Sequence, residues 1–544
     1  PLVTNTWNGT SWSPNIPTDA LHIDQNIVFE GDYNANKNLY GCSCEVKSGA
    51  VVIHENYTLK VTNDVKVTGG SLTFLNTASL VQTNDVANTG NITYKRTTPT
   101  VRTTDYIYWS SPVSGQTIAN FSPTVGSIKY YYDLGWKAPS DSDVMVKGLG
   151  YIIRGQVTSN NKYDASFVGV PNNGPVAITA NTAAKYYLVG NPYPSAIDAD
   201  EFLDQNAGLD GNVYLWTHNT EIAKNAAGTE MVYTSDDYAN YNFTGSTSTF
   251  KSEECKTCPN NAKPIGKIAA GQSFFVKTIS ATSIQFNNNM RVGSKSDDKE
   301  FNSQFFKTTS ANSTKSRTAV VEKHRLWLNL TNNQGAFKQT LIGYVTGATN
   351  DLDARYDGQN FNGNAFINFY SINQNKNFTI QGRALPFDES DEVALGFKST
   401  MKGSFTIAID EVDGLFANQD VFIEDKLKGV TFNLKTGNYT FDTEEGTFNE
   451  RFVIRYINRT LATEDFTIAP NKVLVSVKNK QMKINAAETI DKVVVYDLLG
   501  REIFKKSNVN EKELTVLNLI SNEQALVVKM IFSNGKIVSR KVVY

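Results

Sequence analysis

Three aspartates in the segment NDLDARYDGQN form the densest set of hard oxygen ligands in the chain. Asp351, Asp353 and Asp357 stand at positions i, i+2 and i+6. Oxygen-rich loops of this kind can hold calcium. The segment is not an EF-hand, because Arg355 occupies a ligand position and Asn362 stands in place of the closing glutamate. Two interpretations stay open, a calcium site or a polar turn that faces solvent, and we expect no cofactor other than this calcium.

The four cysteines form two short pairs, Cys42 with Cys44 and Cys255 with Cys258. A zinc site is disfavoured, because the two pairs fall in different predicted domains and no histidine accompanies either. In an oxidising compartment we predict a local disulfide between Cys255 and Cys258. A bridge between Cys42 and Cys44 would close a very tight ring, so that pair is predicted either as a disulfide or as two free thiols.

No catalytic arrangement is recognisable in the sequence. The four histidines, His22, His54, His218 and His324, are scattered over three predicted domains, which argues against a Ser-His-Asp triad. The chain has no P-loop, no G-x-S-x-G and no H-E-x-x-H motif. A carboxylate pair for glycoside hydrolysis is defined by a spatial separation, which sequence does not reveal. We therefore predict a protein that is not an enzyme.

Composition indicates an all-β protein. The 544 residues include 40% hydrophobic, 19% charged and 11% aromatic residues, and polar turn-forming residues fill the remainder. Abundant Thr, Val, Tyr and Phe suit strands, while Asn and Gly suit turns. With 52 basic and 54 acidic residues the net charge is -2, so no strong field directs the chain to nucleic acid or to an anionic membrane. No apolar run reaches the ~20 residues that a membrane-spanning helix needs.

Changes in composition divide the chain into four domains joined by polar linkers. We predict a β-solenoid-like domain over residues 1–99, a β-rich middle domain over 100–291 and a β-sandwich over 318–459. Polar linkers are expected over 292–317 and 460–469, and a small immunoglobulin-like β-sandwich over 470–544. The sandwich is expected to be a two-sheet or jelly-roll fold, because about nine strand-like segments occur in it. Helical turns are expected to be few, with one after Asp198.

Short strands separated by regularly spaced turns favour a solenoid for the first domain. Residues alternate with period two, as at Leu59 and Val61, and turn pairs such as Gly69-Gly70 recur. An ordinary sandwich sheet is the alternative. The opening TWNGTSWSPNIP resembles the start of secreted bacterial β-solenoid domains, and this resemblance implies that Trp7 and Trp12 cap the first coil.

The extreme C-terminus carries the most specific pattern in the chain. The segments IDKVVVYDLLGREIF and NEQALVVKMIFSNGKIVSRKVVY are strands with hairpin turns, and Asn534-Gly535 is a strong hairpin signal. Together they resemble the sorting domain of type IX secretion system substrates of the Bacteroidota, and the flavobacterial version called type C matches best. The residues that carry this resemblance are Val493, Val495, Tyr496, Asp497, Gly500, Arg501, Val527, Lys529, Gly535, Lys541 and Tyr544.

The resemblance implies an exported protein at the cell surface or outside the cell. Its expected partners are the outer-membrane translocon with its shuttle β-barrel, together with surface glycans or other cell-surface proteins. We expect no nucleic-acid partner and no transmembrane segment. The chain opens at Pro1 without a leader, as a mature exported protein would. The passenger is predicted to be an adhesin or a structural, gliding-motility-associated protein. The alternative is a secreted protein that binds or degrades polysaccharide as a lyase or hydrolase.

Overall fold

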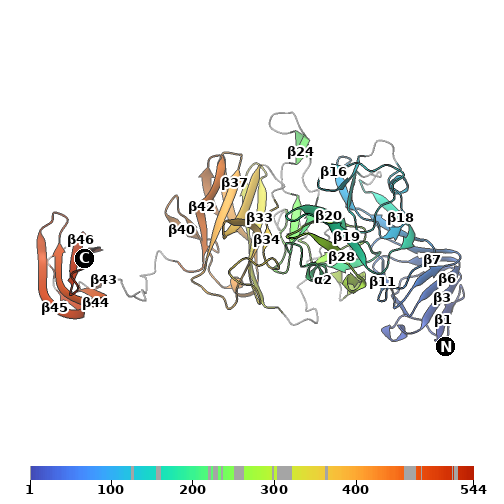
Figure 1. The fold of residues 1–544 in the computed structure, drawn as a ribbon, viewed down its shortest axis with the longest axis horizontal. Helices are drawn as coiled ribbons and strands as arrows, with labels where there is room; N and C mark the ends of the chain where they lie inside the picture. The colour runs from blue at the N-terminus through green and yellow to red at the C-terminus, as the bar shows by residue number, and fades with distance from the viewer. Residues whose placement is uncertain are drawn as a thin grey trace. The chain divides into compact units, whose positions relative to one another are not determined.

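The computed structural model shows a nearly all-β chain, with 54% of residues in strands and 5% in helices (Figure 1). The all-β prediction is therefore confirmed. The structure describes residues 2–123, 128–154, 161–217, 222–224, 231–233, 237–249, 263–296, 299–302, 321–361, 366–458, 473–478, 481–517, 519 and 525–544. The chain divides into two compact units, Pro1–Ile457 and Asn458–Tyr544. Each unit is described by itself below.

The first unit begins with a parallel β-solenoid of three faces, part of which forms the blue stack in Figure 1. The first face contains β1 (Thr4–Trp7), β3 (Asn26–Glu30), β6 (Cys44–Ser48) and β9 (Val65–Val67), with β2 (Trp12–Ser13) added at its edge. The second contains β4 (Tyr33–Ala35), β7 (Ala50–Ile53), β10 (Ser71–Phe74) and β12 (Ile92–Thr97). The third contains β5 (Leu39–Gly41), β8 (Thr58–Val61) and β11 (Ser79–Gln82). The solenoid interpretation is confirmed, and the ordinary sandwich is not.

Glycines stack at the corner between the first two faces of the solenoid. Gly49 joins β6 to β7 at a φ of +86°, and Gly70 precedes β10 at a φ of +69°. A Cβ on Gly70 would lie 2.2 Å from the carbonyl oxygen of Gly49 on the preceding coil. Only glycine permits this positive φ together with so close an approach of two backbones. The coils can therefore stack at strand spacing only because the corner lacks side chains.

Aromatic rings close the first coil as the resemblance implied. The rings of Trp7 and Trp12 are 5.6 Å apart, and each lies within 5.5 Å of the Tyr33 ring. Trp12 also packs edge-on against Phe29, at 5.3 Å. Both tryptophans are partly buried against the solenoid core. They cover apolar side chains that a further coil would otherwise cover.

The described residues of the middle region form several short sheets, two short α-helices and one turn of 3-10 helix at Asn288–Met290. Its longer strands are β13 (Tyr106–Trp109), β15 (Lys129–Tyr132), β17 (Tyr151–Arg154), β18 (Asp164–Pro171), β19 (Val176–Ala180), β20 (Tyr186–Gly190), β22 (Val213–Trp216), β25 (Tyr238–Tyr241), β27 (Ser273–Lys277) and β28 (Thr282–Phe286). Its shorter strands are β14 (Val113–Ser114), β16 (Trp136–Lys137), β21 (Ala196–Asp198), β23 (Ile222–Lys224), β24 (Met231–Tyr233), β26 (Lys267–Ile268), β29 (Arg291–Val292), β30 (Lys295–Ser296) and β31 (Lys299–Glu300). The helices are α1 (Ile118–Phe121) and α2 (Ala199–Gln205). The expected helical turn is α2, which begins where the Asp198 side chain accepts a hydrogen bond from the Asp200 amide.

The solenoid core continues into the middle region. Strand β18 pairs antiparallel with β12, so that Ile92 lies opposite Gly169 and the last coil gains a neighbouring strand. Trp109 is fully buried and packs against Phe121 and Phe167 within one cluster that also contains the solenoid side chains. The boundary expected at residue 99 therefore falls between two parts that share one core.

The sandwich of the first unit is one continuous sheet of eleven strands. Its strands are β32 (Lys323–Asn332), β33 (Phe337–Val345), β34 (Gly358–Gln359), β35 (Ile367–Asn373), β36 (Lys376–Arg383), β37 (Glu392–Ser399), β38 (Gly403–Val412), β39 (Phe422–Asp425), β40 (Val430–Asn433), β41 (Tyr439–Thr443) and β42 (Gly446–Arg455). The pairing order is β40-β39-β42-β37-β35-β36-β33-β32-β38-β41, with β34 paired to β36. The sheet curls so that its two ends come together. The Phe441 ring on β41, at one end of the pairing order, lies 4.7 Å from the Phe452 ring on β42, near the other end. Both rings lie in a single core.

The second unit is a small five-stranded β-domain. Its strands are β43 (Val473–Lys478), β44 (Gln481–Tyr496), β45 (Glu502–Leu517), β46 (Ala525–Phe532) and β47 (Ile537–Val543). The long strand β44 pairs with β43, β45 and β46. The hairpin expected at Asn534-Gly535 joins β46 to β47, and Gly535 has a φ of +82°. An apolar core of its own supports this unit.

Candidate functional site

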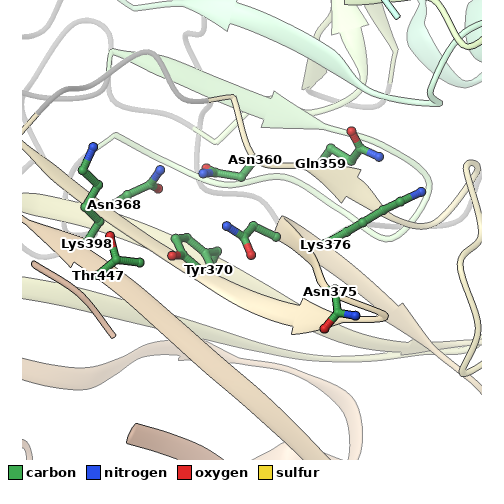
Figure 2. Close-up of a pocket in the computed structure, with 9 residues that line it drawn as sticks. Gln359, Asn360, Asn368, Tyr370, Asn375, Lys376, Lys398 and Thr447 are labelled. Carbon is green, nitrogen blue, oxygen red and sulfur yellow. The ribbon is translucent and has the colours of Figure 1, made fainter. Parts of the chain in front are cut away.

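A polar pocket of about 460 Å³ opens on the eleven-stranded sheet (Figure 2). Its volume falls in the range of small-molecule sites, about 300–1,000 Å³. Strands β34, β35, β36, β37 and β42 supply its lining, together with Asn360 after β34 and Asn375 in the β35–β36 turn. The lining residues are Gln359, Asn360, Asn368, Tyr370, Asn375, Lys376, Asn377, Lys398 and Thr447.

Cross-strand pairing aligns one row of the lining. Asn368 on β35 lies directly opposite Lys398 on β37, and Lys398 lies opposite Thr447 on β42. Directly opposite residues project to the same face of a sheet, so these three side chains stand side by side. The neighbouring residues Ile367 and Phe369 project into the core, because successive side chains alternate between faces.

A tyrosine held by its neighbours forms the floor of the pocket. Tyr370 is only 3% exposed, and its hydroxyl donates a hydrogen bond of 2.9 Å to Asn449 Oδ1. Gly396 lies opposite Tyr370 on β37, and a Cβ there would lie 2.4 Å from the tyrosine ring. The absence of a side chain at Gly396 therefore lets the ring lie across the neighbouring strand. Burial raises the pKa of Tyr370, so its hydroxyl stays protonated at neutral pH.

The pocket has a positive charge balance. Lys376 and Lys398 lie toward opposite ends of the lining with Tyr370 between them (Figure 2). The described residues that line the pocket include no Asp and no Glu. A third cation stands next to the lining, since Lys277 Nζ donates a 2.8 Å hydrogen bond to Gln359 Oε1. The remaining lining side chains are mostly amides, which donate and accept hydrogen bonds equally well.

Comparison with known proteins classifies the larger unit without assigning an activity. A family model described as "Domain of unknown function (DUF8693)" matches residues 2–456. The chain belongs to the DUF8693 family. A second model, "Domain of unknown function (DUF8694)", matches residues 461–544. No curated protein matches the chain.

One solved structure with partial coverage is the 47-kilodalton lipoprotein Tp47 of Treponema pallidum. It shares 9% identity over 64% of this chain and 91% of its own, with a TM-score of 0.12. A score so low carries no argument about the fold or function of the DUF8693 region.

An aromatic cluster of the DUF8693 region adjoins the pocket. The ring of Phe361, two residues after Gln359, lies 4.8 Å from Tyr186, 5.1 Å from Tyr214 and 4.5 Å from Tyr238. The Tyr214 hydroxyl also lies 3.2 Å from the Gln359 carbonyl oxygen. The segment after β34 therefore contacts the pocket and the cluster at once.

Two of the three tryptophans of the middle region are buried, where they offer no surface on which a sugar ring could stack. Trp109 and Trp216 are 0% and 7% exposed and lie in cores. Trp136 is 45% exposed, and its ring packs edge-on against Tyr132 at 5.1 Å. Only Trp136 of these three thus offers an accessible ring.

Backbone amides hold two of the three aspartates of the predicted calcium loop. Asp353 Oδ2 accepts from the Thr349 amide at 2.6 Å, and Asp357 accepts from the amides of Asp353 and Gly382 at 2.8 and 2.9 Å. Burial raises the pKa of Asp357 to about 6. Asp351 instead accepts from the Gln374 side chain, at 2.9 Å. These bonds shape the loop as the polar-turn interpretation requires.

Calcium in this loop stays a prediction. Within the described ranges, no three His, Cys, Asp or Glu side chains form a group that could hold a metal ion. The loop hydrogen bonds already use several of the carboxylate oxygens that a cation would need.

The two solenoid cysteines are free thiols, so the alternative of a Cys42–Cys44 disulfide does not hold in this structure. Cys44 is 1% exposed on β6, and burial raises its pKa to about 12. Cys42 lies at the preceding corner, where its sulfur is 3.1 Å from Asn63 Nδ2. The buried position of Cys44 explains why its thiol stays protonated. Cys255 and Cys258 lie outside the described residues.

Most residues of the C-terminal pattern build the fold of the second unit. Val493 and Val495 are 0% exposed on β44, and Tyr496 lies opposite Val527 on β46. Val527 also pairs with Lys541 on β47. Lys529 on β46 lies opposite Val494, and the Tyr544 hydroxyl accepts a hydrogen bond from the Leu519 amide at 3.2 Å.

The turn between β44 and β45 is held by Asp497. Its carboxylate accepts from the amides of Leu499 and Arg501 at 2.9 Å each, and from Arg501 Nε at 2.7 Å. Gly500 completes the turn at a φ of +80°. These contacts leave Leu498 and Leu499 at the tip with 64% and 80% of their surface exposed.

The sequence offered little warning of the pocket. Its residues come from segments between 359 and 447, and their meeting depends on strand register. The available signal is the amide-rich pair of segments QNFNGN and NQNKN on either side of β35. No helix in the described part of the chain is long and apolar enough to cross a membrane.

Proposed function

We propose that this protein is a non-enzymatic binding protein exported to the cell surface, with residues 470–544 acting as its type IX sorting domain. The passenger acts as an adhesin or a structural, motility-associated surface protein. The translocon and its shuttle barrel are the partners of the C-terminal domain. This proposal rests on the C-terminal residue pattern and on what that pattern builds in three dimensions.

The observation that carries the proposal is a rigid hairpin tip with two exposed leucines. A sorting signal that is read in the folded state needs its own core and an accessible surface. The second unit has such a core, and Asp497 holds the turn that presents Leu498 and Leu499. Adjacent leucines with this exposure contribute little to folding, and they are a surface on which a partner can bury apolar area.

Deletion of residues 470–544 tests the export proposal in a bacterium that has the type IX translocon. The truncated passenger should fold and stay in the periplasm, because the first unit has its own cores. Surface protease accessibility and cell fractionation measure its position. Normal amounts of truncated protein outside the cell would contradict the proposal.

A paired leucine variant separates recognition from folding. Leu498→Ser with Leu499→Ser should reduce surface exposure of the protein to the level of the deletion, with an unchanged melting curve. Leu427→Ser is the matched control, since Leu427 is 73% exposed on the β39–β40 hairpin of the first unit. That control should be exported normally. Equal export of the paired variant and the control would show that the tip is not read.

Polysaccharide binding is the second candidate function, and the polar pocket favours it. Amide, hydroxyl and tyrosine side chains line a pocket of small-molecule size. Hydrolysis by two carboxylates is not supported at this pocket, because its described lining has no Asp or Glu. The pocket therefore favours binding over cleavage of a glycan.

A further inference from the structure

We propose that the pocket on the eleven-stranded sheet binds an acidic oligosaccharide. Its hydroxyl groups would meet the amide side chains of the lining, and its anionic groups would pair with Lys376 and Lys398. The inference goes beyond export, because it names a ligand class for the passenger. It is measured on purified protein, so its failure and a failure of the export proposal are distinguishable.

The lining suits a ligand rich in hydroxyl groups. A sugar hydroxyl donates one hydrogen bond and accepts others, and an amide side chain can meet both needs at once. Five of the nine lining residues carry such an amide. The Asn368 amide is fixed in place, since the residue is only 5% exposed within the sheet. An apolar ligand would displace water from the polar lining without replacing the hydrogen bonds of that water, which disfavours it.

The charge of the lining selects an anionic ligand. Lys376 and Lys398 form no ion pair with the described residues, and no carboxylate lines the pocket. Lys277, which is bonded to Gln359, adds a third positive charge beside the lining. An acidic group placed here gains charge-assisted hydrogen bonds, whereas a neutral sugar does not.

The placement of the lysines indicates a chain of acidic sugars. Lys376 is the first residue of β36 and Lys398 lies on β37, toward opposite ends of the lining (Figure 2). A monosaccharide with one acidic group can pair with only one of them. Lysine is a point charge without the planar fork of arginine, so the pocket does not distinguish carboxylate from sulfate by geometry.

The floor is rigid enough to give specificity. Tyr370 is fixed by Asn449 and by the space above Gly396, so little side-chain entropy is lost when a ligand settles on it. The row of Asn368, Lys398 and Thr447 is set by backbone pairing. A pocket built on strands positions its polar groups better than one built on loops.

Calorimetric titration of the purified full chain tests the inference with three tetrasaccharides. The probes are an oligogalacturonate, which carries carboxylates alone, a κ-carrageenan fragment, which carries sulfates alone, and neutral maltotetraose. We expect an acidic probe to bind at least about tenfold more tightly than the neutral one, the gain expected from one charge-assisted bond. Binding of only one acidic probe identifies carboxylate or sulfate as the recognised group. Equal binding of maltotetraose, or no binding of either acidic probe, would overturn the inference.

Lysine variants locate the site. Lys376→Gln with Lys398→Gln should weaken binding of the acidic probe by about tenfold or more. Lys428→Gln is the matched control, because Lys428 is an exposed lysine of the same sheet outside the lining. The control should bind the acidic probe as tightly as the unaltered protein does. The double variant, the control and the unaltered protein should have the same melting temperature. Unchanged affinity of the double variant would place the ligand elsewhere and overturn the inference.

Discussion

Asp210 is a buried carboxyl group beside the aromatic cluster. Its Oδ2 accepts a 3.0 Å hydrogen bond from the Tyr214 hydroxyl, and its Oδ1 accepts from the Asn212 amide at 3.2 Å. Burial raises the pKa of Asp210 to about 7, although Tyr214 and the Asn212 amide act to lower it. In the unfolded chain an aspartate ionises near pH 3.9. At a pH between these two pKa values, Asp210 is therefore protonated in the native state and ionised in the unfolded state.

The first prediction concerns Asp210→Asn and pH. Because the native pKa is raised, the stability that this carboxyl contributes is full below about pH 4 and is lost as the pH rises through about 7. Asparagine keeps the shape without ionising. The variant should match the unaltered protein near pH 4 and exceed it by about 2–4 kcal/mol at pH 8.

Urea unfolding of both proteins between pH 4 and pH 8 measures this difference. The extra free energy of unfolding of the Asp210→Asn variant should grow from pH 4 upward and level off above pH 7. A difference that is constant with pH would mean that Asp210 is ionised throughout the range.

Residue types alone predicted some local features and could not predict the pocket. The alternation of Ile367 and Phe369 with Asn368 and Tyr370 indicates a strand with one apolar face. Nothing in that pattern shows that Lys398 lies beside Asn368, because 30 residues separate them and register sets the contact. In the aspartate loop, the spacing suggested a cation, and the structure shows carboxylate oxygens of Asp353 and Asp357 accepting hydrogen bonds from backbone amides, so calcium there stays a prediction.

At the scale of elements, the solenoid depends on its glycine corner. Gly31, Gly49, Gly70 and Gly90 each stand two residues before a buried residue of the second face. Strand pairing places the buried residues that follow Gly49 and Gly70, Val51 and Leu72, opposite each other. This G-x-hydrophobic repeat, about 20 residues apart, is the signal that would have fixed the coils from sequence. Strand alternation alone predicted the fold type but not its register.

The second prediction is that Gly70→Ala destabilises the first unit by about 3 kcal/mol or more. Alanine at a φ of +69° is strained by about 1–2 kcal/mol, and its Cβ would collide with the Gly49 backbone. Gly115→Ala is the matched control, since Gly115 has a φ of +84° with nothing within 4 Å of a Cβ. It should lose only about 1–2 kcal/mol. Equal losses of unfolding free energy in the Gly70→Ala and Gly115→Ala variants, measured with denaturant, would show that the coils do not rely on close approach at this corner.

At the scale of the whole molecule, the two compact units should unfold separately. Their cores are distinct, and the boundary at residues 457 and 458 lies near the linker expected over 460–469. The third prediction is two transitions in calorimetry of the full chain. Leu328→Ala should lower only the melting temperature of the first unit, and Val495→Ala only that of the second unit. Each side chain is fully buried in the core of its own unit. A single transition, or a shift of both by either variant, would contradict independent folding.

The central claim is that the C-terminal unit directs export, and a gain-of-function fusion tests it most directly. Residues 458–544 are attached to a fluorescent protein that is sent to the periplasm of a bacterium with the type IX translocon. The share of fluorescence at the cell surface or in the medium is then measured. We predict that the fusion leaves the periplasm, while the same fusion with Leu498→Ser and Leu499→Ser stays there. A fusion distributed like the unattached fluorescent protein would contradict the claim.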